Sequence, residues 1–347
     1  MILNQWKLIA GTEMSKTCVP SAIVGGSLEG RLVAWNGMAA DTDKSILYFA
    51  GSGGHSDYAG NEACAIDLKQ AAPTWKLLRD TTPQEQVIFE TDYYADGRPS
   101  STHTYYAMQF ISSLNRVFRV GSGSNWGSGN YGDSHLNSFD VSKNDWDPKG
   151  TWPDIPGGRG LEESVCKDQL TEEIYTPGNL ILRKFSPATG GWASLASFTT
   201  LDNYGVGQLY QIPCAVDHRR KKVIFFGDQY HPGKGISYDI ATDTMVNFNF
   251  SGSAAVTVSS FKENYVWYDD TYDAFFYKNG QNNQVYIINA ADFSAEPLTT
   301  IGGSTIPNAA AGTGAEGSVL TRWQRVPNLK GYVYYPTTGG LWFLATE

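Results

Sequence analysis

The sequence predicts an all-β fold, a closed ring of six four-stranded blades. An apolar strand ending in Asp or an equivalent residue recurs along the chain, followed by Trp or another large apolar residue. The copies are Asp67 with Trp75, Asp140 with Trp146, Ser186 with Trp192, Asp239 with Met245 and, more loosely, Asn289 with Leu298. The sixth copy is split, because 341–344 supply its strand and Trp6 its aromatic residue. Successive copies lie 46 to 71 residues apart, a spacing typical of propeller blades.

Composition agrees with one such ring. The 347 residues include 37 glycines, and only 18% are charged, which suits many short strands joined by tight turns. No linker interrupts the pattern, so we expect a single domain over residues 1–347. The net charge is −9, and the one basic run, Arg219 to Lys222, falls in a predicted hairpin turn. Nucleic acid is therefore not an expected partner.

The first two blades follow from apolar runs bounded by turn residues. In the first, the run from Ile46 to Ala50 leads into glycines that allow the chain to leave the sheet. Its expected strands are 31–35, 45–50, 62–68 and 74–78. The second blade is expected to use 104–111, 116–120 and 136–141, with an outer strand near Trp146 or Trp152. The second unit is long enough to contain an extra blade, so a seven-bladed ring is an alternative.

The other four blades repeat the plan with shorter connections. The third is expected at 163–167, 173–176, 180–185 and Trp192, and the fourth at 213–217, 223–227, 235–240 and 245–250. The fifth takes 264–268, 274–277, 284–289 and 296–299. The sixth takes 318–324, 331–335 and 341–345, and residues 5–9 close it. Pairing both ends of the chain in one sheet removes an exposed strand edge.

The four cysteines are far apart and show no paired spacing. They are Cys18, Cys64, Cys166 and Cys214. Three pairings are possible and the spacing favours none, so we expect buried thiols rather than a disulfide framework or a metal site.

Two segments carry a resemblance to a known family. The segment 46–75 resembles the kelch-type blade, because it has an apolar strand, a glycine pair, a further strand and a Trp in that order. The resemblance covers the whole chain. The segments from Gly53 to Glu62 and from Arg98 to Tyr105 are similar to a bacterial and phage subgroup of galactose-oxidase-like propellers. Such a resemblance implies the fold and says little about function.

The copper-radical oxidases of that superfamily need a Tyr-His pair and a further histidine downstream. Tyr230-His231 resembles the pair, but no histidine follows it. We therefore expect no copper. The five histidines also lack the close spacing of a metal site, so we expect no metal and no cofactor.

The predicted rim loops are rich in aromatic and short polar residues. Aromatic faces stack on sugar rings, and short polar side chains bond to hydroxyl groups. The loops into first strands share a face with those between second and third strands, so His55, His103, His135 and His231 are expected on one rim. The candidate ligand-binding residues are His55, Asp57, Tyr58, Asn61, Arg98, His103, Trp126, Tyr131, Tyr230 and His231.

These loops favour a non-enzymatic recognition propeller that binds a glycan or another host-surface ligand. The alternative is a carbohydrate-active enzyme of polysaccharide-lyase type, with His103 and Tyr105 as base and acid. For the segment from Gly53 to Glu62, a purely structural interpretation is that its polar residues only fix the turn. A third possibility is a structural propeller that docks other subunits.

The start of the chain suggests a location. Residues Met1 to Trp6 carry no basic flank, and no apolar run approaches the roughly 18 residues of a membrane span. We therefore expect neither a signal peptide nor membrane insertion. A phage virion or tail-associated adhesin, extracellular after lysis, fits these features and would also contact other virion subunits. The other expectation is a cytoplasmic protein.

Overall fold

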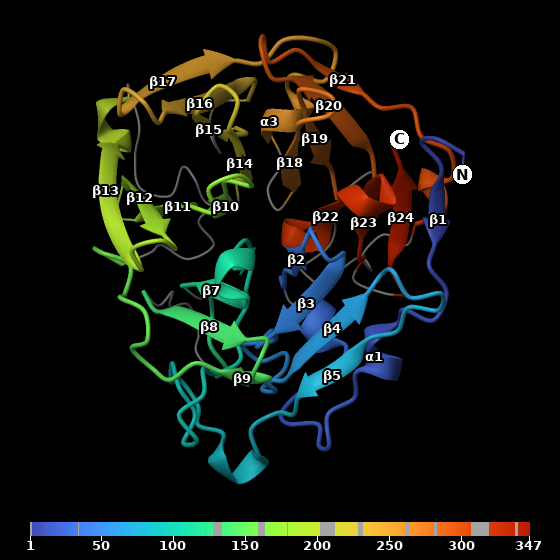
Figure 1. Cartoon of the computed structure of the whole chain (residues 1–347), viewed down its shortest axis with the longest axis vertical. Coiled ribbons are helices and arrows are strands. Elements are labelled where there is room, and N and C mark those ends of the chain that lie inside the picture. Colours follow the sequence, from blue (N-terminus) through green and yellow to red (C-terminus); the bar gives the residue numbers. More distant parts are fainter. Residues whose placement is uncertain are drawn as a thin grey trace.

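The strands form a ring of antiparallel sheets around a common axis (Figure 1). The computed structural model describes residues 2–33, 35–121, 123–127, 134–158, 164–178, 180–201, 212–227, 232–260, 264–280, 283–306, 319–336 and 339–347. Within these ranges there are six four-stranded sheets. The predicted six-bladed all-β propeller is therefore confirmed.

Each blade runs from its innermost to its outermost strand in chain order. The first holds β2 (Ala39–Asp41), β3 (Ile46–Ala50), β4 (Ala63–Asp67) and β5 (Lys76–Arg79). The second holds β6 (Met108–Ile111), β7 (Arg116–Val120), β8 (Leu136–Asp140) and β9 (Asp145–Trp146). The third holds β10 (Cys166–Lys167), β11 (Ile174–Gly178), β12 (Ile181–Ser186) and β13 (Gly191–Ser197).

The fourth blade holds β14 (Cys214–Asp217), β15 (Lys222–Phe225), β16 (Lys234–Asp239) and β17 (Thr244–Asn249). The fifth holds β18 (Tyr265–Asp269), β19 (Ala274–Lys278), β20 (Val285–Asn289) and β21 (Ala295–Pro297). The sixth holds β22 (Trp323–Val326), β23 (Gly331–Tyr334) and β24 (Trp342–Ala345), with β1 (Trp6–Leu8) as its outermost strand. In the described part of the chain, three short α-helices lie outside the sheets: α1 (Met14–Thr17), α2 (Gly30–Val33) and α3 (Thr257–Ser260).

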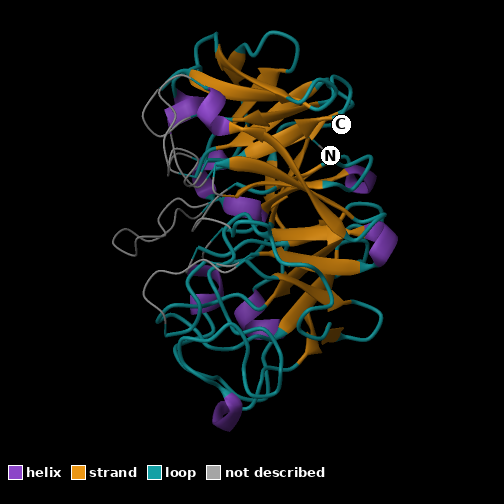
Figure 2. Cartoon of the chain, turned by 90° about the vertical axis from the view of Figure 1, so that its left-hand side faces the viewer, coloured by secondary structure: helices purple, strands orange, loops and turns teal. Residues whose placement is uncertain are grey.

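The two ends of the chain close the ring as the sequence predicts. Strand β1 pairs antiparallel with β24, and Trp6 lies opposite Leu344. The N- and C-termini accordingly lie side by side (Figure 1). Figure 2 shows the ring from the side, with long loops gathered on one face and mostly short turns on the other.

One expected strand is wrong. Residues 31–35 were expected to start the first blade, but α2 occupies 30–33 and the innermost strand is β2 at 39–41. In α2, Arg31 forms a buried ion pair with Glu62. The true strand begins with two alanines, whose small side chains fit the crowded axis but carry no strong strand propensity.

The recurring tryptophans join neighbouring blades. The indole Nε1 of Trp146, in the second blade, donates to Asn61 O of the first at 3.2 Å. Trp192 donates to Pro153 O at 2.9 Å, and Trp75 to Thr12 O, just after β1, at 2.9 Å. Each indole therefore bonds to a segment outside its own blade.

The recurring aspartates form turns. In four of the copies the side chain accepts a hydrogen bond from the backbone N–H two residues later, the Asx-turn geometry. The acceptor and donor pairs are Asp67 with Lys69, Asp140 with Ser142, Asp239 with Ala241 and Asn289 with Ala291, at 2.8 to 2.9 Å. The repeat therefore encodes the turn between the third and fourth strands.

Aromatic side chains fill the ring's axis. Tyr106, at the start of the second blade, stacks on Tyr265 of the opposite fifth blade with ring centroids 6.2 Å apart. Both belong to a buried cluster that also includes Trp323 of the sixth blade. The side chains of opposite blades thus meet at the centre.

The cysteine prediction needs correction. Cys18 and Cys64 form a disulfide, whereas Cys166 and Cys214 are buried free thiols as expected. The pairing arises because the segment after β1 folds back over the first blade and brings Cys18 onto β4. Their separation of 46 residues in the sequence gave no sign of this contact.

Candidate functional site

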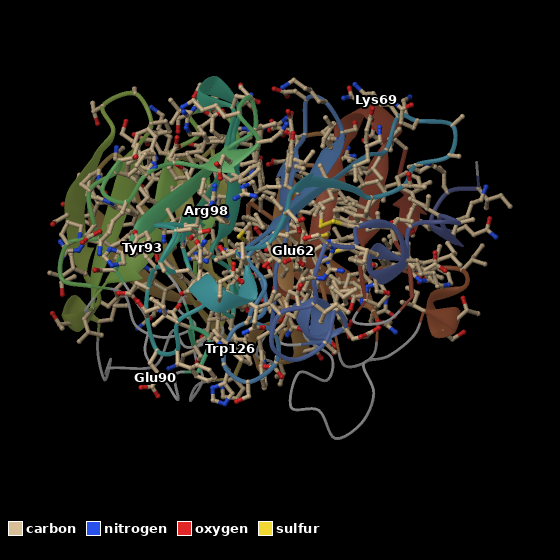
Figure 3. All side chains as sticks on the ribbon, turned by 90° about the horizontal axis from the view of Figure 1, so that it is seen from below. Glu62, Lys69, Glu90, Tyr93, Arg98 and Trp126 are labelled. Atoms are coloured by element: carbon tan, nitrogen blue, oxygen red, sulfur yellow. A yellow bond between two sulfur atoms is a disulfide. The ribbon has the colours of Figure 1, made fainter. Side chains whose placement is uncertain are left out.

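The long loops of the first two blades lie on one face of the ring. In an antiparallel blade, the loop between the second and third strands leaves by the same edge as the connection to the next blade. The loop 51–62, the connection 80–107 and the described parts of 121–135 therefore share a face. Figure 3 shows Trp126 and Glu90 on this face and Lys69, in the β4–β5 turn, on the opposite one.

Backbone hydrogen bonds join four segments of this face into one layer. Tyr58 bridges to Gly26, and Thr102 bridges to both Ser52 and Asn125. His55 N also donates to Asn125 O at 3.1 Å. We name this layer the rim platform. It consists of residues 23–31, 51–62, 86–104 and 123–127.

A buried ion pair supports the platform from below. Arg31 Nη1 lies 2.9 Å from Glu62 Oε1, and both side chains are buried. The Tyr58 hydroxyl donates to Glu62 Oε2 at 3.2 Å. Burial raises the pKa of Glu62, while Arg31 and the Tyr58 hydroxyl favour its charged form. Removing one partner would leave a buried charge without its counterpart.

Two predicted ligand-binding residues belong to this support. Tyr58 is 0% exposed and Asn61 is 1% exposed. The Asn61 amide donates to Pro99 O at 2.9 Å, and its Oδ1 accepts from Thr82 N at 2.8 Å. Both side chains therefore face the interior, and neither contributes to the rim surface in this structure. A glycine-rich loop gave no sign that its Tyr and Asn turn inward.

His103 is the centre of a polar chain. The ring is 3% exposed, with Nε2 2.9 Å from Asp57 Oδ2 and Nδ1 3.3 Å from the Tyr105 hydroxyl. Tyr105 is also buried, whereas Asp57 is half-buried. A general base must present a nitrogen to the proton that it removes. Here both nitrogens already have protein partners, so the two groups of the enzymatic alternative are bonded to each other.

Backbone strain is concentrated around His103. Trp35, His55 and Tyr105 have φ values of +37°, +45° and +41°, in a region that costs a bulky residue about 1–3 kcal/mol. The Trp35 and His55 rings lie 5.2 and 5.9 Å from the His103 ring. Such strain persists where the surroundings fix it and often marks functional sites.

An aromatic pair forms part of the platform's surface. Phe89 is 66% exposed, and its ring lies 5.3 Å from that of Trp126. The indole rests on Gly25, where a Cβ atom would lie 2.6 Å from Trp126 Cζ2. The neighbouring Ile88 is exposed as well. We name Phe89 and Trp126 the aromatic patch, since exposed apolar groups with a polar border are typical of interaction sites.

Acidic groups lie next to this patch. His135 stands between two carboxylates, with Nε2 3.3 Å from Asp92 and Nδ1 2.8 Å from Asp154. The hydrogen bond with His135 keeps the pKa of Asp92 below its usual value. Asn125, beside Trp126, donates to Asp92 at 2.8 Å. His135 therefore forms a second polar cluster, separate from the His55–His103 contact.

Arg98, another predicted ligand-binding residue, clamps two blades together. Its Nε and Nη2 lie 2.8 and 2.9 Å from the carboxylate of Asp145 in β9, and its Nη1 lies 2.7 Å from Asp96. Arg79 at the end of β5 also reaches Asp145, at 3.0 Å. These bonds raise the pKa of Arg98. Its guanidinium thus bonds to protein carboxylates.

The remaining candidates fall outside the described residues. Tyr131, Tyr230 and His231 lie there, and their roles stay predictions. Sequence reasoning in turn missed Phe89 and the Arg31–Glu62 pair. The apolar run from Val87 to Phe89 inside a polar loop was the available signal for the first. Nothing marked the second, because the partners are 31 residues apart.

The residues that the structure describes include neither a metal centre nor a membrane-spanning helix. No group of three or more His, Cys, Asp or Glu residues there could hold a metal ion. No helix among those residues has the length and apolar character needed to cross a membrane. In comparisons with known proteins, the chain matches no family model, and no curated protein is detectably similar to it in sequence.

Proposed function

We propose that this propeller is a recognition module and that the rim platform binds a glycan on a host surface. The observation that carries the proposal is the aromatic patch, in which the exposed Phe89 packs against the half-buried Trp126 beside polar groups. Stacking on such rings combined with hydrogen bonds from short polar side chains suits sugar recognition. The half-buried Asp57 and the nearby His55 supply those polar groups.

Rigidity of the platform supports recognition. Its four segments are joined by backbone hydrogen bonds, and Trp126 N also donates to Ser101 O at 2.9 Å. The Arg31–Glu62 pair and the Cys18–Cys64 disulfide fix the segments from below. A surface ordered before binding loses less entropy when its ligand arrives.

The biological placement is part of the same proposal. We place the chain among kelch-type propellers of bacterial and phage origin, as a virion or tail-associated adhesin, on the resemblance of its glycine-rich motifs. The Cys18–Cys64 disulfide supports an extracellular position, because disulfides persist in oxidising surroundings.

The polysaccharide-lyase alternative has less support from the geometry. Its proposed base, His103, is buried and bonded at both ring nitrogens, to Asp57 and to Tyr105. Release of unsaturated sugar from a uronic-acid polymer, abolished by His103→Ala, would nevertheless establish that activity and displace recognition as the main function.

A glycan array tests the proposal. The wild-type protein is compared with Trp126→Ala and Phe89→Ala, and with Tyr272→Ala as a control. Tyr272 is an exposed aromatic residue in the β18–β19 turn on the opposite face. We expect specific glycan binding that each patch variant weakens by about 30-fold or more, as for an aromatic hot spot of about 2 kcal/mol.

The control variant should bind like the wild type. An array on which the wild-type protein binds no glycan would refute recognition of sugars. Binding that survives both patch substitutions would show that the recognition surface lies elsewhere on the ring. Circular dichroism of each variant establishes that the fold is retained.

A further inference from the structure

The charges around the aromatic patch point to the chemistry of its ligand. Resting on the proposed function, we propose that the rim platform selects glycans that carry protonated amino groups over neutral or anionic glycans. The patch supplies the stacking surface, and the carboxylates beside it supply the charge preference.

Four acidic residues are linked to the aromatic pair through the chain or through hydrogen bonds. Glu90 is exposed and follows Phe89 directly, and its backbone N–H donates to Trp126 O at 2.9 Å. Asp154 is 55% exposed at its side chain, and Asp92 is half-buried beside Asn125. Asp57 lies in the loop 51–62, in which His55 N donates to Asn125 O next to Trp126.

Three basic groups in the described part of this face, Arg98, His135 and Lys149, each contact a protein partner. Arg98 donates to the carboxylates of Asp96 and Asp145. His135 contacts two carboxylates, and the Lys149 ammonium lies 4.6 Å from the centre of the Tyr93 ring. These cations are therefore already paired and would not attract an anionic sugar. The carboxylates of the platform would repel it.

A protonated amine fits both features of the platform. Cations are attracted to the faces of Trp and Phe rings, most strongly to Trp, and the carboxylates add Coulomb attraction. The Lys149–Tyr93 contact shows that an ammonium group already lies over an aromatic ring on this face. The overall charge of −9 acts in the same direction.

Titration calorimetry tests this selectivity with matched tetrasaccharides. The probes are a β-1,4-linked glucosamine tetramer, its fully N-acetylated counterpart and a tetragalacturonate, at about pH 5.5, above the ordinary pKa of aspartate. We expect the amino sugar to bind at least about tenfold more tightly than the acetylated one. Its affinity should fall as salt is raised, because salt screens the carboxylates.

A charge-neutralising variant locates the effect. Glu90→Gln/Asp154→Asn should bind the glucosamine tetramer several-fold more weakly and the acetylated tetramer unchanged. The control is Asp43→Asn, an exposed carboxylate in the β2–β3 turn on the opposite face, which should change neither affinity.

The outcomes separate the two proposals. Equal binding of the acetylated and free-amine tetramers, both lost in Trp126→Ala, would overturn the charge preference and leave glycan recognition standing. A preference for tetragalacturonate would overturn it as well. Binding of a lysine tetrapeptide as tightly as the amino sugar would show that the platform reads amines and not sugars. Failure of all three sugars, together with a blank glycan array, would overturn the proposed function itself.

Discussion

The Cys18–Cys64 disulfide makes a quantitative prediction about stability. It joins residues 46 positions apart and ties the segment after β1 to the central part of β4. In the chain-entropy description, a crosslink across a loop of this length restricts the unfolded chain by about 4 kcal/mol at 25 °C. The substitution Cys18→Ala/Cys64→Ala removes the crosslink, so the free energy of unfolding should fall by about this amount.

The free cysteines offer a matched control. Cys166 and Cys214 are buried like the disulfide pair, so Cys166→Ala/Cys214→Ala removes the same atoms without breaking a crosslink. The difference between the two double variants therefore isolates the crosslink from the loss of packed sulfur atoms.

Urea unfolding followed by tryptophan fluorescence measures both variants. With a slope of about 3 kcal/mol/M, a loss of about 4 kcal/mol lowers the urea midpoint by about 1.3 M. The control should show a clearly smaller shift. Equal shifts in the two variants would refute the reasoning, because they would mean that packing and not the crosslink accounts for the loss.

Three further predictions concern the platform and its supports. Glu62→Gln should lower the free energy of unfolding by about 3–5 kcal/mol, because it leaves Arg31 buried without its counter-charge; unchanged stability in urea would contradict the buried pair. Hydrogen bonds from Arg98 hold the pKa of Asp145 below its usual value, so this pair stabilises the fold above about pH 4, and the stability is lost as pH falls further. The melting temperatures of Asp145→Asn and wild type should therefore converge on acidification, and a constant difference would argue against the pair. Gly123→Ala should lower the free energy of unfolding by about 1–3 kcal/mol, because the new Cβ would lie 2.4 Å from Cε2 of the Tyr105 ring. An unchanged melting temperature would contradict that contact.

The ring was predictable because its signals are local and repeated. Asp67 and its equivalents mark turns through a hydrogen bond two residues along the chain, and a short-range bond leaves a short-range pattern. Trp146 recurs for a different reason, since its indole bonds to the neighbouring blade. Equivalent contacts recur because each blade packs against the next in the same way. Closure by Trp6 followed from the same count.

The failures involve contacts between distant residues. The apolar neighbours of Arg31 fit a strand, whereas in the structure Arg31 lies in α2 and pairs with Glu62, a contact that no local pattern marks. Cys18 gave no sign of its bond to Cys64 for the same reason. At the site, residue type alone could not separate the inward-facing Tyr58 from the exposed Phe89. The sequence therefore placed candidate residues in three of the four platform segments, but it gave no sign of the segment 23–31 or of which side chains form the surface.

Hydrogen–deuterium exchange tests most directly whether recognition takes place on the rim platform. The measurement compares the protein alone with the protein saturated by the glycan that binds best on the array. We predict slower exchange in 51–62, 86–104 and 123–127, and no change in the opposite-face turns at 42–45 and 218–221. Protection confined to those opposite turns, with the platform unaffected, would contradict the assignment of the binding surface.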